Sequence, residues 1–522
     1  MPLTKESEEK STATTAPAAT SDVATRSLLS LFSELAAASV DAEDDAEALM
    51  RRNELATRVR AALTDVDTLH TLERDAASAL VHGSVAHCIV EAVSTHSPVA
   101  VRLVAMEQLG TFFSLTITAD HRARLAAVLV RIGLPRVLID DALCNDAIDV
   151  SQAAMRLLLR WGGDPSAHVS ASFFAAGGDA VCEWLTRRLP DTSDVVRMRF
   201  FELVVLLVAR NDAVASRALA CADVVALLDA LAATLAGDDL LLKLNVVELV
   251  TELCGVEDGV RFCEQRGILA RFHALVGAES ADPAERMYAA HVVKYIGRFA
   301  SRNVYDCAGA AVNRAALVAQ LARLVASAQD ADLLAEAFAA LASLTVAVEP
   351  AQAATLADTV REHVVPRITA YNRELSAAAL YAIASLVRRL GAAAAESFVQ
   401  QCRIDDDPLL LALRTRTLRH NETAKTRQRH AAFECLKAVA EQPWGVSLLV
   451  NDAEWFALLV SRDSEVNTAG WHAKYDLVRT VEEHLVHARV DAAKAAELQR
   501  YLRQGAIFVA SAQVKPEVGV ML

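Results

Sequence analysis

The chain has 522 residues, more than one compact core normally holds, and carries a formal net charge of −14 at pH 7. A surface of that sign repels nucleic-acid phosphates, so we expect no nucleic acid as the main partner. Hydrophobic residues make up 53% of the chain with only 12 prolines and 19 glycines, which favours long helices over strand-rich folds, and the aliphatic stretches are too short to span a membrane.

The nine cysteines are scattered along the chain and include no CxxC pair. Such spacing is typical of free thiols in a reducing compartment, and not of a disulfide framework. The N-terminus is polar and lacks a secretory signal. We therefore expect a cytoplasmic protein, with the nucleus left open as a second location.

The first 25 residues are rich in Ser, Thr, Ala, Glu and Lys, and are predicted to form a disordered tail. From residue 26 to 510, apolar residues follow the helical period almost without interruption, and strong strand signals are absent. Residues 511–522 form a predicted C-terminal tail. The fold class is therefore all-α.

One short pattern recurs along the predicted helices. A basic residue stands five positions before a glutamate in Val101–Glu107, Val196–Glu202, Leu242–Glu248 and Gln428–Glu434, and weaker copies begin near Ser151, Arg286 and Ser376. We call the basic position the marker position. It falls at 102, 151, 197, 243 and 286, in steps of 49, 46, 46 and 43, about the period of armadillo and HEAT repeats. Because five residues turn a helix by roughly 500°, the marker and the glutamate flank the apolar stripe and do not pair.

The apolar residues of each copy form one stripe of a helix. Val196, Phe200, Leu203 and Leu207 are spaced for one face, and Leu242, Val246, Leu249 and Leu253 repeat that spacing. Two segments, Gly259–Leu275 and Gly445–Val460, consist of a short helix, a break at Gly267 or Asn451, and another helix. One such unit cannot bury its apolar face alone, so the units must stack. The sequence predicts a right-handed armadillo/HEAT-like superhelical solenoid.

Signatures of catalysis are missing from the sequence. It contains no Walker loop, no Gly-rich dinucleotide loop, no GxSxG elbow and no HExxH. We expect no enzyme, no cofactor and no metal. His484 and His487, beside Glu482 and Glu483, could hold a metal ion, but a solvated polar face is the interpretation we favour.

Two further features leave a structural and a functional interpretation open. The basic segment 414–430 could contact an acidic partner or act as a nuclear-import signal, although most such runs are solvated loops. Trp444 and Trp471 could anchor an interface, although their apolar surroundings favour core packing.

Short motifs occur in one collinear order along the chain. In the C-terminal third these are Glu441–Gly445, Ser461–Glu465, Ala473–Val478 and Tyr501–Gly505. In the centre these are Val196–Leu203, Glu248–Cys254, Gly259 and Gln265–Ile268. In that order they resemble the 26S proteasome non-ATPase regulatory subunit 5 family, clearly over 190–300 and 428–510 and thinly over 300–425. The basic segment 414–430 departs from the family pattern.

The resemblance implies an assembly chaperone of the base of the proteasome regulatory particle. Members of that family bind the C-terminal domain of one ATPase of the hexameric ring. They hold a partial ATPase module and delay its docking on the proteolytic core. We expect a monomer that binds such an ATPase subunit, and neither nucleic acid nor membrane.

The predicted partner-binding residues are the polar residues of the helices expected to line the inner face of the solenoid. They are Arg197, Arg199, Glu202, Lys243, Glu248, Glu252, Arg286, His291 and Lys294. The alternative is another armadillo adaptor, such as a nuclear-transport receptor. Import adaptors resemble one another in a repeated Trp and Asn, where these helices carry Phe201, Val247 and Val293. An armadillo-containing ubiquitin ligase would need a further domain, for which no stretch outside the repeats is long enough.

Overall fold

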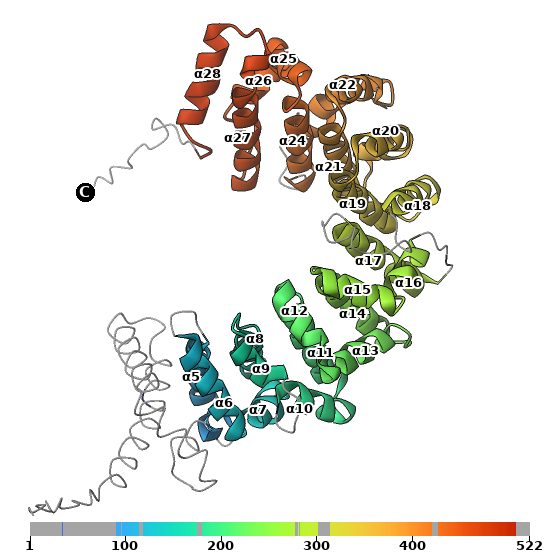
Figure 1. Cartoon of the computed structure of the whole chain (residues 1–522). Coiled ribbons are helices and arrows are strands. Elements are labelled where there is room, and N and C mark those ends of the chain that lie inside the picture. The colour runs from blue at the N-terminus through green and yellow to red at the C-terminus, as the bar shows by residue number, and fades with distance from the viewer. Residues whose placement is uncertain are drawn as a thin grey trace, which may run out of the picture. The chain divides into compact units, whose positions relative to one another are not determined.

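The computed structural model describes residue 34 and most of the chain from 90 to 507 (Figure 1). The described ranges are 90–95, 97–113, 118–174, 180–276, 280, 282–300, 314–419 and 426–507. The predicted tails, 1–25 and 511–522, lie outside the described residues. The chain divides into two compact units, Met1–Ala233 and Thr234–Leu522, which are described separately.

Unit 1 is built from helices in two layers. The helices are α5 (Val99–Phe112), α6 (Ala119–Arg131), α7 (Leu134–Val137), η2 (Leu138–Leu143), α8 (Ile148–Gly162), α9 (Ala167–Phe174), α10 (Val181–Arg188), η3 (Leu189–Asp191), α11 (Asp194–Val208), α12 (Asp212–Leu219) and α13 (Ala222–Thr234), which reaches the unit boundary. In one layer α5 packs on α8 and α8 on α11, and in the other α6 packs on α9 and α9 on α10.

Unit 2 continues the same organisation. Its first helices are α14 (Leu240–Leu253), α15 (Glu257–Gln265), α16 (Ile268–Leu275), α17 (Pro283–Ala300), α18 (Arg314–Ser327), α19 (Ala331–Ala347), α20 (Pro350–Thr359), η5 (Val360–Val364) and η6 (Val365–Thr369). They are followed by α21 (Arg373–Arg389), α22 (Ala392–Gln401), α23 (Leu409–Ala412), η7 (Leu413–Leu418), α24 (Thr426–Ala440), α25 (Pro443–Asn451), α26 (Ala453–Val460), α27 (Thr468–Glu483), η9 (Leu485–His487) and α28 (Ala492–Arg503). Two short strands, β1 (Arg403–Ile404) and β2 (Asp407–Pro408), pair antiparallel.

Six helices of unit 2 form a continuous row. Helices α14, α17, α19, α21, α24 and α27 each pack on the next. Figure 1 shows α17 to α27 of this row on one side of the unit and α18, α20 and α22 on the other. We call these six helices the helix row. The predicted all-α armadillo/HEAT-like solenoid is confirmed by this stacking of short-helix and long-helix layers.

Polar side chains fix where many of the helices begin. A helix leaves its first N–H groups without partners, and a short side-chain oxygen just before it accepts from them. The residues that do so are Ser193, Asn211, Asp239, Asp330, Asn372, Asp452, Asn467 and Asp491. Ser193 and Asp239 thus fix the starts of α11 and α14, the two helices that carry the clearest copies of the recurring pattern.

The apolar stripes match the prediction in α11 and deviate from it in α14. Val196, Phe200, Leu203 and Leu207 are all buried. In α14, Val246 and Leu253 are buried, whereas Leu242 and Leu249 are only half-buried. Val247 and Val250 are buried as well, as are their equivalents in α11, so the two helices bury the same face but that of α14 is narrower.

Glycine permits two consecutive helices of a repeat to approach each other closely. Gly259 in α15 and Gly445 in α25 lie against the last turn of α14 and α24, where a Cβ atom would overlap the carbonyl groups of Leu253 and Val439. The predicted break at Gly267 is a left-handed residue with φ of 66°. The break predicted at Asn451 is also present, since α25 ends there.

Among the described helices, none combines the length and apolar character of a membrane span.

Candidate protein-binding face

Five of the seven residues at the marker position, all except Ser151 and Lys243, act as structural caps. Their side chains donate hydrogen bonds to carbonyl oxygens in the segment that leads into their own helix, and so hold each connection to the helix that follows it. The pairs are Arg102 with Val93 (3.0 Å), Arg197 with Thr192 (3.4 Å), Arg286 with Ser280 (3.3 Å), Ser376 with Ile368, and Arg429 with Leu418 (2.9 Å). The recurring motif therefore reports on repeat architecture more than on partner binding.

The predicted residues of α11 lie in unit 1. Arg197 also forms an ion pair with Asp194 at 2.8 Å. Arg199 reaches back to the preceding repeat and donates to the carbonyls of Leu143 (3.0 Å) and Asn145 (2.8 Å). Glu202 is exposed. The guanidinium groups of α11 thus serve the packing of unit 1.

The predicted residues of α14 begin the exposed face of the helix row. The Lys243 ammonium lies 5.7 Å from the centre of the Tyr288 ring, and Glu248 and Glu252 are exposed. Burial raises the pKa of Tyr295 in α17, and a hydrogen bond with Glu248 adds to this. Burial lowers the pKa of His291, and Lys294 lowers it further, while Glu248 opposes the change. Glu248 therefore couples α14 electrostatically to α17.

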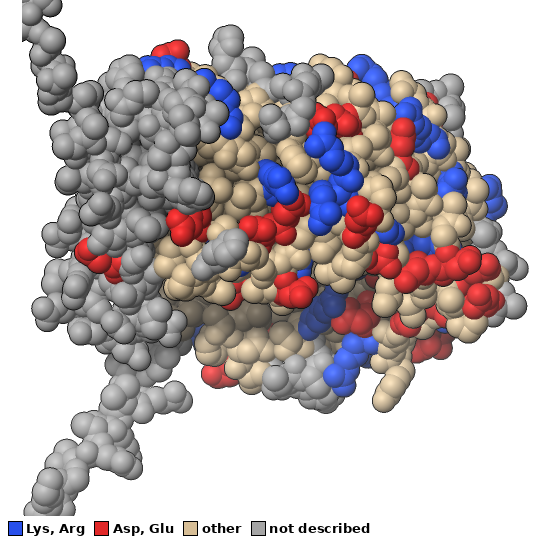
Figure 2. Space-filling model, turned by 90° about the horizontal axis from the view of Figure 1, so that it is seen from below, with Lys and Arg blue, Asp and Glu red and all other residues tan. Residues whose placement is uncertain are grey.

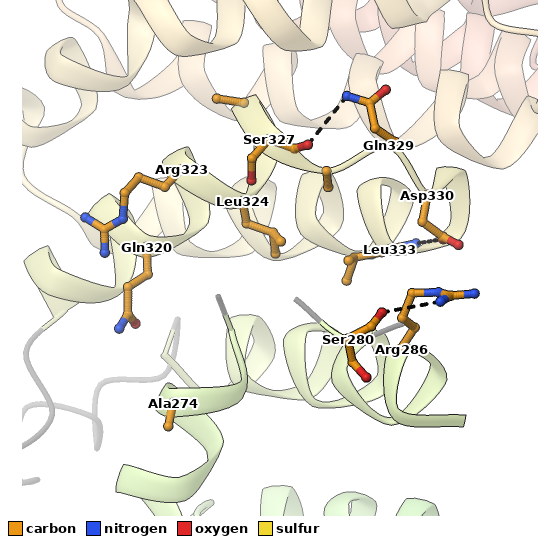
Figure 3. Close-up of a pocket in the computed structure, with 12 residues that line it drawn as sticks. Ala274, Ser280, Arg286, Gln320, Arg323, Leu324, Ser327, Gln329, Asp330 and Leu333 are labelled. Carbon is orange, nitrogen blue, oxygen red and sulfur yellow. Dashed lines mark hydrogen bonds between the residues drawn. The ribbon is translucent and has the colours of Figure 1, made fainter. Parts of the chain in front are cut away.

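Arg286 lies away from that face. It lines a cavity of 1220 Å³ between the ends of α16, α17, α18 and α19 (Figure 3). In Figure 3 its guanidinium bonds the carbonyl of Ser280, opposite Asp330 and Leu333. The structure thus separates Arg286 from His291 and Lys294, although all three belong to α17.

His291 and Lys294 line a groove across four helices of the row. The groove has a volume of 470 Å³. Its lining residues are Met287, Ala290, His291 and Lys294 of α17, Asp332, Ala335, Glu336 and Ala339 of α19, Glu374, Ala377, Ala378 and Tyr381 of α21, and Arg427 of α24. We call this the row groove. Small alanines form much of its wall and leave room for a partner between the longer side chains.

Opposite charges alternate along the row groove. Lys294 Nζ lies 4.0 Å from Glu336 Oε1, and Arg427 forms an ion pair with Glu374. Burial raises the pKa of Glu336, whereas Lys294 and the neighbouring arginines act in the opposite direction. The alternating charges of the row groove suit a partner with its own mixed charges, since charge complementarity sets specificity and register. Figure 2 views the molecule from below and shows that Lys, Arg, Asp and Glu side chains are also intermixed on the described surface drawn there.

Comparison with known proteins places this architecture. The family model described as "Proteasome non-ATPase 26S subunit" matches residues 175–519, most of the chain and all of the row groove. The chain belongs to this family. It is 24% identical over 329 residues to the human protein named 26S proteasome non-ATPase regulatory subunit 5, covering 61% of this chain and 63% of that protein. The bovine protein of the same name is 25% identical over 334 residues, with the same coverage.

The similarity to these relatives covers only part of each of them. The chain spans 63% of the length of these human and bovine proteins. Among solved structures, a computationally designed armadillo repeat protein covers 49% of this chain and 98% of its own, at 15% identity and a TM-score of 0.32. The family model confirms the resemblance predicted from the sequence.

Several groove residues of this family member were not predicted. Glu336, Glu374, Tyr381 and Arg427 lie between 331 and 427, mostly where the sequence resemblance is thin. A signal for two of them exists in the repeat register. Glu248, His291, Tyr381 and Glu434 each stand five residues after a marker position, and Glu336 stands five residues after the start of α19. Extending the register through α19 and α21 would have predicted Glu336 and Tyr381.

The basic segment 414–430 makes contacts within unit 2. Its residues 420–425 lie outside the described residues. Arg414 pairs with Asp452 (3.1 Å), Arg416 with Asp407 (2.7 Å), and the buried Arg429 with Glu465. His430 Nδ1 lies 2.8 Å from the Tyr381 hydroxyl. The described part is therefore not a solvated loop, because Arg414, Arg429 and His430 contact residues of other elements of unit 2.

The two tryptophans are half-buried. The Trp471 indole donates to the carbonyl of Glu465 at 2.9 Å. The Trp444 indole nitrogen is buried and has no hydrogen-bond partner among the described residues. His484 Nδ1 lies 2.9 Å from the Thr480 carbonyl, and its ring centre is 6.2 Å from that of His487. Within the described ranges, no group of three or more His, Cys, Asp or Glu side chains is arranged to hold a metal ion.

The positions that distinguish an import adaptor are core residues here. Phe201, Val247 and Val293 are all buried. They therefore offer no polar side chain to a bound peptide. This burial argues against the nuclear-transport alternative.

Proposed function

We propose that this chain is an assembly chaperone of the base of the 26S proteasome regulatory particle. It binds the C-terminal domain of one ATPase subunit and delays docking of that subunit on the core particle. Membership of the proteasome non-ATPase subunit family is the observation that carries the proposal. The open row groove within the matched segment supports it by supplying a surface of the right kind.

The row groove favours a protein partner of complementary chemistry. Three carboxylates, Asp332, Glu336 and Glu374, face two basic side chains, Lys294 and Arg427. The exposed Met287 offers an apolar anchor at one end. A partner that presents basic side chains around an apolar centre would match this arrangement, since interface cores are apolar and their rims polar.

The proposed action is steric and non-enzymatic. A rigid stack of helices that occupies one face of an ATPase subunit blocks other proteins from that face without any chemical step. It requires neither a nucleotide nor a metal ion. We place this activity in the cytoplasm, with the nucleus as a second location.

Affinity purification of the tagged full chain from its source cell tests this function. The proposal expects regulatory-particle ATPase subunits among the co-purified proteins, together with a deficit of core-particle subunits. Recovery of the chain with no proteasomal ATPase would contradict the proposal. Recovery in stoichiometric complex with intact core particles would contradict the delayed docking.

A further inference from the structure

Cys221 occupies a helix-capping position in unit 1. Its carbonyl accepts the first hydrogen bond of α13, from the Val225 N–H at 3.1 Å. The backbone N–H groups of Asp223 and Val224 lie beside its sulfur, at the start of α13. Other helix starts in this chain use the oxygen of a Ser, Asn or Asp at the equivalent point. A neutral thiol is a weak acceptor there, whereas a thiolate is a strong one.

A second cysteine lies against this sulfur. Cys182, in the first turn of α10, is fully buried, and its side chain lies beside that of Cys221. The same two helices are joined by the Thr186 hydroxyl, which lies 3.3 Å from the carbonyl of Asp223. Cys221 itself is only half-buried. The pair therefore combines one sulfur that reagents can reach with one that they cannot.

The surroundings shift the pKa values of the two thiols in opposite directions. The hydrogen bond from Cys182, assisted by two backbone N–H groups, lowers the pKa of Cys221 to about 6, although burial and Asp223 oppose this. Burial raises the pKa of Cys182 well above its ordinary value. Burial likewise raises the pKa of Cys402 and of Cys435 to about 12, and raises that of Cys144. A nucleophilic sulfur at neutral pH is thus expected at Cys221.

We propose that Cys221 and Cys182 are a redox-active dithiol, which a hydroperoxide oxidises to a disulfide linking α10 to the start of α13. This modification site is independent of the proposed chaperone function.

The chemistry proceeds in two balanced steps. The Cys221 thiolate attacks the outer oxygen of the hydroperoxide, so that an S–O bond forms, the O–O bond breaks and the alcohol or water leaves with a proton from solvent. The Cys182 sulfur then attacks the sulfur of the resulting sulfenic acid. The S–S bond forms, and the hydroxyl leaves as water with the Cys182 proton. Two thiols are oxidised and one hydroperoxide is reduced.

The disulfide would close a loop that contains α11 and α12. Closing a loop restricts the unfolded chain, so oxidation is expected to raise the thermal midpoint of unit 1. It would also restrain α11, which carries Arg197 and Arg199. Both cysteines and α11 lie within residues 175–519, so the modification acts inside the family-matched segment.

The test uses the full-length reduced protein and hydrogen peroxide. Alkylation at pH 7 should modify Cys221 at least about 10-fold faster than Cys144, because reactivity follows the thiolate fraction. In a separate sample that has not been alkylated, peroxide should yield a disulfide-linked Cys182–Cys221 peptide on mapping. The intact mass should fall by two hydrogens. Equal alkylation of Cys221 and Cys144, or peroxide treatment that leaves both thiols of the pair free, would overturn the proposal.

Variants separate the roles of the two sulfurs. Cys182→Ser should stop at a sulfenic acid on Cys221, which a cyclic 1,3-dione traps, and Cys221→Ser should abolish the peroxide reaction. Cys144→Ser is the matched control and should leave disulfide formation unchanged. Circular dichroism of each variant checks the fold. A folded Cys182→Ser protein with no trapped adduct would contradict the mechanism as firmly as a missing disulfide in the unmodified chain.

Discussion

At the scale of single residues, the C-terminal repeats contain charges buried between helices. Arg429 is 2% exposed and donates to Ser464 O (2.9 Å), to Leu418 O (2.9 Å) and to the Glu465 carboxylate. Lys474 is also 2% exposed and donates to Ser464 Oγ at 2.6 Å. Buried charges persist only when their partners are in place, so these residues are sensitive points of the fold.

Arg429→Ala is expected to destabilise the chain by about 3–5 kcal/mol, because it leaves the Glu465 carboxylate buried without its cation. Arg427→Ala is the matched control. That side chain is 67% exposed two residues away, and its loss should cost no more than about 0.5 kcal/mol. Denaturant titration of both variants measures the difference. Equal stability losses in the two variants would contradict the structural role of the marker arginine.

The lowered pKa of Lys474 leads to a prediction of how the free energy of unfolding depends on pH. Burial lowers its pKa from 10.5 to about 7, with Arg462 and Arg429 acting in the same direction and Glu465 and Asp463 opposing. Between these values the unfolded chain binds the proton and the folded chain does not. The free energy of unfolding should therefore rise with pH in this window, by at most about 1.4 kcal/mol per pH unit, and the full cost of the buried charge is present below it.

Lys474→Met should remove that rise. Thermal midpoints at pH 7 and pH 9 measure it, with Lys437→Met, a half-buried lysine of α24, as the control. The wild type and Lys437→Met should gain stability relative to Lys474→Met as the pH increases. Parallel curves for all three proteins would show that Lys474 is not the group responsible.

At the scale of elements, close packing of consecutive helices explains the repeated glycine. Gly445→Ala should cost more than about 1 kcal/mol, because the new Cβ atom would overlap the Val439 carbonyl region and separate α25 from α24. Gly391→Ala adds its Cβ to open space before α22. Its effect should stay within about 0.5 kcal/mol, since lower entropy of the unfolded chain offsets a poorer cap. Similar losses at both glycines would contradict the steric explanation.

The sequence predicts where the helices lie better than it predicts which side of each helix is buried. Helical periodicity correctly gives the stripe of α11 and the breaks at Gly267 and Asn451, because burial and turn chemistry act locally. It misplaces part of the α14 stripe, and it does not reveal that the marker arginines cap their own connections. Those features depend on how each helix packs against its neighbours. The row groove likewise brings together residues from four helices, so no single segment contains its signal.

At the scale of the whole molecule, the proposed function requires that the row groove be exposed to a partner. Lys294→Glu reverses the basic charge that α17 presents to the row groove. It should weaken ATPase binding at least about 10-fold, or 1.4 kcal/mol, because a few central residues dominate an interface. Its effect on stability should stay below about 1 kcal/mol, since the ion pair with Glu336 is only half-buried. Arg323→Glu, exposed on α18 outside the helix row, is the matched control.

The most direct measurement is a binding titration of the purified full chain with the C-terminal domain of each regulatory-particle ATPase in turn. The account predicts saturable binding of one domain, a loss of at least about 10-fold with Lys294→Glu, and no change with Arg323→Glu. Binding to none of the domains would contradict the proposed function. Binding that Lys294→Glu leaves unchanged, in a protein that remains folded, would contradict the row groove as the site.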